Sequence, residues 1–247
     1  MDQEKLQRFA ALLRDSRRAV FFGGAGVSTE SGVKDYRSED GLYNTVRQYG
    51  VSPETILSHS FFLQSPEVFY DFYYNYFLNG SAEPNRAHRA LAELETRGIL
   101  SAVITQNIDG LHQKAGSRNV IELHGTTRTN HCTRCGAEAG ADVLRAFGGK
   151  PAKCEKCGGL LKPDVVLYEE SLNEDTIDSA VDAIINADLL IIGGTSLAVY
   201  PAAGFIRYFR GEDIVLINRG ETAYDDEADL VFRDSIGEVL DGAVRLL

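Results

Sequence analysis

The strongest constraint on how this chain can fold is the spacing of its cysteines. The sequence holds four of them, Cys132, Cys135, Cys154 and Cys157, arranged as two C-x2-C pairs with eighteen residues between the pairs. This spacing is typical of a zinc site with four thiolate ligands. Four sulfurs at about 2.3 Å complete a tetrahedron around Zn²⁺ and leave no open position. Such a site is structural, so we expect the chemistry elsewhere in the chain.

Disulfide bonds and a redox C-x2-C pair explain these cysteines less well. Residues 1–18 mix both charge signs and lack the apolar segment of a secretory signal, so we expect a reducing, cytoplasmic location. A redox site does not usually need two matched pairs. No apolar run approaches about 18 residues, so we expect no membrane span.

Short apolar segments alternate with helical patterns along the 247 residues. Strands are predicted at residues 19–22, 102–105, 120–123, 164–167, 188–192, 214–217 and 230–232. Helices are predicted at residues 2–16, 67–77, 87–97, 175–186 and 235–244, with another opening at Pro201. This alternation is typical of an α/β fold of the doubly wound, Rossmann-like kind, in which helices cover both faces of a parallel sheet.

Two stretches interrupt the alternation and predict a smaller lobe within one catalytic domain. The large part is expected from about residues 1–34, 92–126 and 161–247. The small lobe is expected from a helical insertion at about residues 35–91 and a zinc ribbon at about residues 127–160.

Glycines directly follow the first predicted strand, in the run Gly23-Gly24-Ala25-Gly26. At such a place glycine lets the backbone approach a pyrophosphate, whose charge then meets N–H groups at a helix start. A plain turn at a strand end explains so short a motif equally well. The dehydrogenase fingerprint is incomplete, because Thr29 stands where its third glycine belongs and no acidic ribose ligand follows about 20 residues later.

A wider set of motifs resembles the sirtuin family. Residues 24–37 resemble its nucleotide-loop motif GAGxSxxSGIPDFR, and four later blocks follow in the family's order, at residues 105–112, 122–125, 194–197 and 217–218. The cysteine pairs fall where sirtuins carry a zinc ribbon. The resemblance covers nearly the whole chain. It implies an NAD-dependent protein lysine deacylase, with NAD as co-substrate, one structural Zn²⁺ and acyl-lysine proteins as substrates.

The resemblance also implies roles for individual residues. At the pyrophosphate, NAD would be held by Gly24, Ala25, Gly26, Ser28 and Thr29, and the loop that covers the cofactor would contribute Asp35, Tyr36 and Arg37. Gln106 would bind the ribose, and the nicotinamide would lie against Asn107, Ile108 and Asp109. The phosphate and adenine ribose would be held by Gly194, Thr195, Ser196 and Asn218, and the adenine by Ser235. Catalysis would fall to His124 and Asn107. Residues 165–172 resemble the strand that pairs with the substrate peptide, so Val166, Leu167 and Tyr168 would bind substrate.

His124 is the expected general base. Cleavage of the nicotinamide–ribose bond builds a cation that an acyl oxygen can capture, and the product of that capture collapses only if a ribose hydroxyl loses its proton. A histidine suits this task near neutral pH. The other four histidines, His59, His88, His112 and His131, are expected to be structural, with His88 a hydrogen-bonding residue at a helix start.

Three positions depart from the family pattern: Lys34 and Tyr36 in the covering loop, and Glu169 where the substrate strand has glycine. Glu169 is expected to change the main-chain path or to favour basic flanking residues. Sirtuins that remove succinyl groups carry a Tyr-x-x-Arg pair, and the matching positions here are Phe72 and Asn75. We therefore expect a neutral acyl group, acetyl or a longer apolar chain.

Two other functions remain open on the sequence. A mono-ADP-ribosyltransferase would use the same cation with another acceptor, but it needs no ribose-hydroxyl base. A zinc-ribbon adaptor would not need a complete pocket. The formal net charge of −11 argues against nucleic-acid binding, which requires clustered Lys and Arg. We expect a monomer that acts on protein substrates.

Overall fold

The computed structural model describes residues 1–33 and 46–247, so Lys34, Asp35, Tyr36 and Arg37 lie outside the described residues. The larger part is built on a parallel sheet of six strands in the order β3-β2-β1-β7-β8-β9. The strands are β1 (Ala19–Gly23), β2 (Leu100–Thr105), β3 (Val120–Glu122), β7 (Leu189–Gly193), β8 (Asp213–Ile217) and β9 (Leu230–Phe232). This arrangement confirms the predicted fold class.

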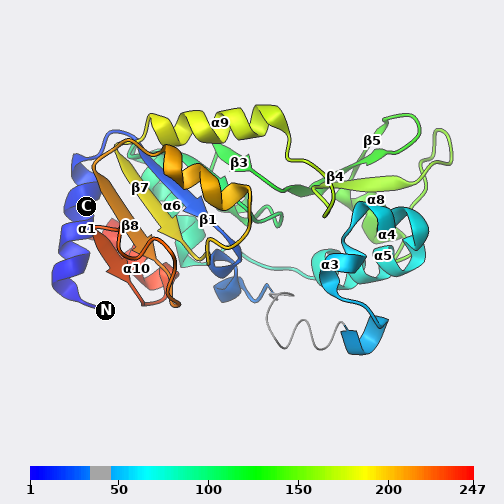
Figure 1. Ribbon diagram of the computed structural model, residues 1–247, viewed down its shortest axis with the longest axis horizontal. Helices are drawn as coiled ribbons and strands as arrows, with labels where there is room; N and C mark the ends of the chain where they lie inside the picture. Colours follow the sequence, from blue (N-terminus) through cyan, green and yellow to red (C-terminus); the bar gives the residue numbers. More distant parts are fainter. Residues whose placement is uncertain (34–45) are drawn as a thin grey trace.

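Helices cover both faces of this sheet, because successive side chains of each strand point to opposite faces. Phe21 packs with α1 (Gln3–Asp15), α6 (Arg86–Thr96) and α10 (Ile236–Val244). Phe22 packs with α9 (Glu174–Ile185) and η4 (Ala202–Tyr208). Figure 1 shows α9 and α10 on opposite sides of the sheet. The central strands β1 and β7 are buried at every residue, as continuous apolar runs predict.

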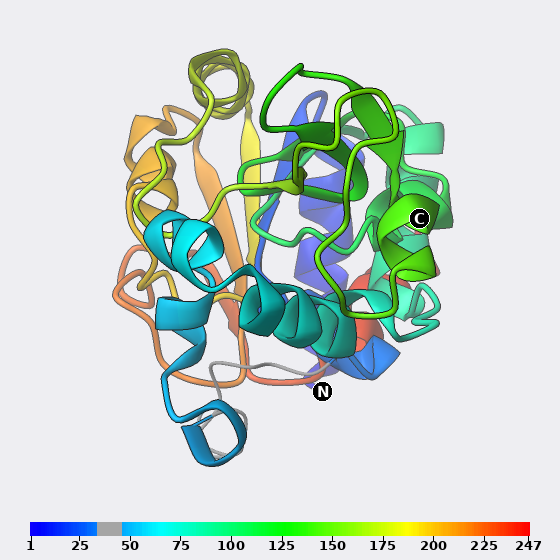
Figure 2. The ribbon, with the colours of Figure 1, turned by 90° about the vertical axis from the view of Figure 1, so that its right-hand side faces the viewer.

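The small lobe has its own core and its own sheet. Its strands β4 (Gly125–Cys132), β5 (Glu138–Gly140) and β6 (Leu161–Val165) form an antiparallel sheet in the order β5-β4-β6. Its helices are α3 (Pro53–Ile56), α4 (His59–Gln64), α5 (Pro66–Tyr73) and α8 (Ala141–Ala146), and a π-helical turn, η3 (Tyr74–Leu78), follows α5. Figures 1 and 2 show these elements gathered at one end of the molecule.

One strand prediction needs correction. The strand expected at residues 164–167 is β6, which begins earlier and pairs with β4 of the small lobe instead of joining the parallel sheet. The strand β3 is half-buried, because it lies at the sheet edge beside β2. No helix in the described part of the chain is both long and apolar enough to cross a membrane.

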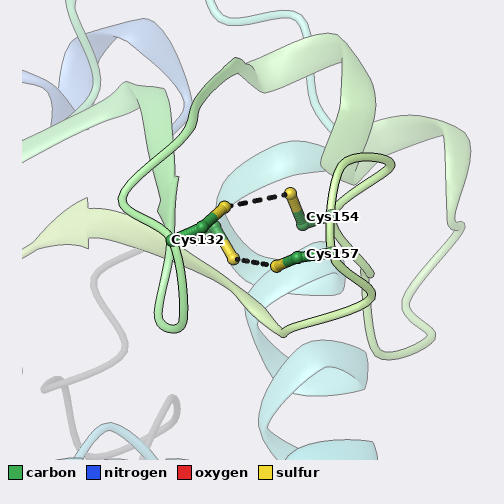
Figure 3. A group of neighbouring side chains, drawn as sticks. Cys132, Cys154 and Cys157 are labelled. Atoms are coloured by element: carbon green, nitrogen blue, oxygen red, sulfur yellow. Dashed lines mark hydrogen bonds between the residues drawn. The ribbon is translucent and has the colours of Figure 1, made fainter.

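The four cysteines meet at the far end of the small lobe. Their sulfur atoms all lie within 4.8 Å of one another, with 3.4 Å between Cys132 and Cys157 and 3.8 Å between Cys135 and Cys154. Figure 3 shows the sulfurs of Cys132, Cys154 and Cys157 directed toward a common centre. Four ligands at about 2.3 Å from one ion require separations of this size. All four thiols are free of disulfides, so the donor set fits structural Zn²⁺.

We predict one zinc ion per chain at this cluster. Chelation should unfold the small lobe and abolish activity, because the binding free energy of structural zinc is folding free energy. Elemental analysis and thermal melting with and without chelator test this. A protein that lacks zinc, or one whose melting and activity survive chelation, would contradict the prediction.

Two buried histidines lie side by side between α6 and α7 (Leu111–Ala115). The ring centroids of His88 and His112 are 4.7 Å apart, and both side chains are almost fully buried. His88 accepts a hydrogen bond from the backbone N–H of Asn85 at the start of α6, which confirms its predicted role. Burial lowers the pKa of His88 to about 4, and burial together with His88 lowers the pKa of His112 to about 3.

These shifts predict that acid destabilises the protein. Because both folded-state pKa values lie below the usual value near 6.5, the unfolded chain binds more protons as the pH falls from about 6.5 toward 3. Each such proton lowers the free energy of unfolding by about 1.4 kcal/mol per pH unit. We expect His112→Leu to flatten this dependence by about one proton, measured by urea unfolding from pH 7 to 4. Parallel wild-type and variant curves would contradict it.

Candidate functional site

Two glycine loops pack directly on each other at the carboxyl ends of β1 and β7. The Gly26 N–H donates to the Gly194 carbonyl at 2.8 Å. A Cβ atom at Gly26 would lie 2.8 Å from the Gly194 Cα, and Gly194 itself has φ +60° with the Val27 nitrogen 2.5 Å from where its Cβ would be. Only glycine fits either position. In the strand order, β1 and β7 flank the point where the connections reverse, which is where open α/β sheets bind ligands.

Gln106, directly after β2, joins a third loop to this pair. Its backbone N–H donates to the Gly23 carbonyl at 3.0 Å, and its side-chain Nε2 donates to Thr195 Oγ1 at 3.2 Å. Thr195 Oγ1 also accepts from the Leu197 N–H. The loops that follow β1, β2 and β7 are therefore cross-linked.

A partly buried polar network adjoins the first glycine loop. The Ser28 hydroxyl donates to Asp109 Oδ2 at 2.6 Å, and Asp109 Oδ1 accepts from the Leu111 N–H. Asn107 Nδ2 donates to the Gly24 carbonyl and to Ser28 Oγ, both at 3.0 Å. These bonds fix the orientation of the Asn107 and Asp109 side chains before any ligand arrives.

His124 lies at the junction of the two lobes, between β3 and β4. Its Nδ1 is 3.0 Å from the Gln106 carbonyl. Since a carbonyl can only accept, Nδ1 carries the hydrogen in the neutral ring, and the lone pair is on Nε2. The next residue, Gly125, has φ +76°, and its Cβ would lie 2.0 Å from the Asp164 carbonyl oxygen. This glycine lets β4 approach β6 closely enough for the His124 carbonyl to accept from Val166.

The substrate segment expected at Val166, Leu167 and Tyr168 is held along one side by the start of α4. The Tyr168 N–H donates to the Leu57 carbonyl, and its carbonyl accepts from the His59 N–H, both at 3.0 Å. At the end of the segment, Glu170 binds the Leu167 N–H at 2.8 Å.

Glu170 is also the centre of a charge cluster beneath this segment. Burial opposes its ionisation, but the Leu167 N–H, His59 and the buried Lys162, whose Nζ is 3.0 Å away, together lower the pKa of its carboxyl. An ionised Glu170 therefore anchors the segment.

Glu169 takes the left-handed conformation that its family's glycine would adopt freely, with φ +75°. This conformation is costly for a residue with a side chain. Its carboxylate accepts from the Ser60 N–H and from the Ser60 hydroxyl, both at 2.9 Å, and these bonds offset the cost. The carboxylate is therefore hydrogen-bonded within the protein, but Glu169 is exposed beside the substrate segment, so its expected effect on the main-chain path or on basic flanking residues stays a prediction.

A cavity of about 1080 Å³ lies between the lobes and collects many of the predicted residues. Those on its lining are Ala25, Ser28, Gln106, Asn107, Ile108, Asp109, His124, Val166, Leu167 and Tyr168. A second group of predicted residues forms the glycine loops or lies beside them, outside this lining: Gly24, Gly26, Thr29, Gly194, Thr195, Ser196, Asn218 and Ser235. The sequence motifs thus converge on one region with two parts.

Ser235 is held by a contact that the sequence did not suggest. Its hydroxyl donates to Glu30 Oε1, and the Gly237 N–H reaches the same oxygen at 3.3 Å. Glu30 thereby ties the short helix η2 (Thr29–Ser31) to the start of α10. The interaction joins positions that are far apart in sequence, so no local signal predicts it.

One wall of the cavity contains the predicted position Asn75 beside residues that the sequence comparison did not assign to it. Phe72 is fully buried, stacks on Tyr76 at 4.4 Å and is absent from this lining, whereas Tyr73, which is also buried, reaches it. A π-helical turn begins at Tyr74, directly after these two residues. Arg145 of α8 also lines the cavity, with its guanidinium bonded to Asp142 at 3.1 Å.

Comparisons with known proteins agree with this geometry. The profile of the Sir2 family matches residues 24–201. The NAD-dependent protein deacetylase of Clostridium acetobutylicum is 52% identical over 98% of each chain, and that of Cutibacterium acnes is 51% identical over 97% of each. A solved Sir2 homologue in complex with NAD is 40% identical over 99% of this chain and 93% of that one, with a TM-score of 0.87.

A solved Sir2 protein bound to an acetylated peptide is 35% identical over 95% of each chain, with a TM-score of 0.84. The family match begins at the first glycine loop and includes the second glycine loop, the polar network, His124 and the cysteine cluster. The chain therefore belongs to the Sir2 family.

Proposed function

We infer that this protein is an NAD-dependent protein lysine deacetylase, which releases nicotinamide, free lysine and O-acetyl-ADP-ribose. The observation that carries this conclusion is His124, held by the Gln106 carbonyl at 3.0 Å beside the cofactor network and bonded through its own carbonyl to the substrate segment at Val166. The relatives named above are deacetylases over the full length of the chain.

We assign NAD to the crosslinked glycine loops and the cavity beside them. The residues fit this ligand, because the glycines let the two loops pack against each other beside the helix start at Ala25, and the adjoining Asn107 and Asp109 are pre-oriented. Asp109 would accept from the carboxamide of nicotinamide, and Gln106 would bind the ribose. Thr195, Ser196 and Asn218 would hold phosphate and adenine ribose, and Ser235 would lie near the adenine.

When bound, NAD supplies the electrophilic ribose carbon that the acyl oxygen captures. The residues of this chain bind the peptide and transfer the proton. Val166, Leu167 and Tyr168 pair with the substrate peptide and direct its acyl-lysine into the cavity, as an added strand does at a sheet edge. His124 Nε2 takes the proton from the ribose hydroxyl, and the Gln106 carbonyl stabilises the resulting imidazolium through Nδ1–H.

A mono-ADP-ribosyltransferase has no use for a base held in this orientation, and a zinc-ribbon adaptor has no use for a pre-oriented pocket. Incubation with NAD and an acetyl-lysine peptide separates the three functions. Deacetylation gives nicotinamide and free lysine, transferase activity gives a modified acceptor, and an adaptor gives neither. We further propose a cytoplasmic monomer without nucleic-acid or membrane partners, consistent with its net charge of −11.

We predict that His124→Ala reduces deacetylation by about 10²–10⁴-fold while NAD still binds. The base acts after the nicotinamide bond breaks, so some nicotinamide exchange should remain. Turnover assays and calorimetric NAD titration measure both effects. The control is His131→Gln, because His131 of β4 is hydrogen-bonded to Asp164 of β6 and has no proposed role in the reaction. An His124→Ala enzyme within a factor of a few of wild type would refute the assignment.

We predict that acetyl-lysine is preferred over succinyl-lysine by at least about tenfold in kcat/KM. Desolvating a succinyl carboxylate costs several kcal/mol unless a cation pairs with it. Phe72 and Asn75 supply no charge, and the cations that the described residues place on the cavity lining, Arg145 and Lys114, pair with Asp142 and Glu83. The comparison uses one peptide with either acyl group. Equal turnover of the succinyl peptide would contradict the prediction, and its selective loss in Arg145→Gln would identify the cation responsible.

A further inference from the structure

The cofactor loop of residues 24–33 is fixed at two ends by different parts of the molecule. At its beginning, Asn107 binds the Gly24 carbonyl and the Gly26 N–H binds Gly194, so this end is tied to the sheet. At its other end, Asn85 Nδ2 donates to the Val27 carbonyl at 2.7 Å and to Ser31 Oγ at 3.0 Å. Ser31, Gly32 and Val33 then enter the cavity lining.

Asn85 can hold this loop because it is itself rigidly held. It is the N-cap residue of α6, where its Oδ1 accepts from the Ala87 N–H at 2.9 Å and the His88 N–H at 3.4 Å. His88 completes a capping box by accepting from the Asn85 N–H. Because His88 is fully buried and α6 packs on both the sheet and α10, the amide is presented from a fixed point.

We propose that Asn85 is a positioning residue for NAD: through its amide donor it sets the turn of the cofactor loop between η1 (Ala25–Val27) and η2, and thereby the affinity for NAD. The proposal rests on the assignment of this loop to NAD. Asn85 is not among the described residues that line the cavity, so it acts on NAD through the loop. The two halves of its side chain have separate tasks, since Oδ1 caps the helix and Nδ2 holds the loop.

This division of tasks allows a clean test. Ser and Asp are as good as Asn at an N-cap, so Asn85→Ser and Asn85→Asp keep the acceptor for α6 but remove the amide donor. In Asn85→Asp a carboxylate oxygen also faces the Val27 carbonyl. We expect the KM and Kd for NAD to rise by about tenfold or more, the effect of leaving the buried Val27 carbonyl without its donor. The KM for the acetylated peptide should stay close to wild type, and the fall in melting temperature should be that of one lost hydrogen bond, because the cap of α6 remains.

The matched control is Asn173→Asp. Asn173 caps α9 in the same way, by accepting from the Thr176 N–H and hydroxyl, and it is exposed. This variant should leave every NAD parameter unchanged. Asn85→Ala adds a stability arm, because it removes the cap as well and should lower the melting temperature more than Asn85→Ser does.

The results separate failure of this inference from failure of the function itself. A wild-type protein that does not bind NAD, or a Ser28→Ala variant that binds it as tightly as wild type, would remove the assignment of the loop. If Ser28→Ala weakens NAD binding but a folded Asn85→Ser binds it with wild-type affinity, the loop assignment stands and the positioning role of Asn85 is wrong. Parallel losses of NAD and peptide affinity in Asn85→Ser would also overturn it, since they indicate general loss of structure.

Discussion

The contact between two glycine loops determines where everything else in this molecule can lie. Gly26 and Gly194 approach so closely that neither tolerates a Cβ atom, and the approach is possible only because β1 and β7 are neighbours at the point where the sheet connections reverse. Gln106 then crosslinks both loops, and its carbonyl orients His124. The proposed cofactor site and the proposed general base are thus parts of one backbone arrangement, which the sheet dictates.

The small lobe positions the proposed substrate segment through similarly short-range contacts. Gly125 brings β4 against β6, and the residues that follow β6 form that segment. That segment is stabilised from below by the ionised Glu170 with Lys162, and at its end by the bonds from Glu169 to Ser60. The cysteine cluster lies at the opposite end of the same sheet, so a zinc ion there would stabilise the strands that lead to the proposed substrate segment without touching that segment.

The sequence predicted the features that depend on local pattern. Cysteine spacing indicated the sulfur cluster, apolar runs indicated the parallel sheet, and the ordered motifs indicated the residues around His124. What it could not indicate depends on tertiary contact. The antiparallel pairing of β6, the bond from Asn85 to Val27 and the contact of Glu30 with Ser235 join distant segments. The place of Tyr73 on the cavity lining, next to the buried Phe72, likewise depends on tertiary packing.

His124 forms hydrogen bonds to both parts of the molecule. Its ring is bonded to Gln106 of the larger part, while its carbonyl is bonded to Val166 of the segment that receives the peptide. On the assignments proposed above, the distance between base and acyl-lysine is set through a single residue rather than across the whole gap between the lobes. Because the ring is bonded to one lobe and the carbonyl to the other, a tilt of the small lobe would have to break one of these two bonds, so His124 resists a change in the width of the cavity.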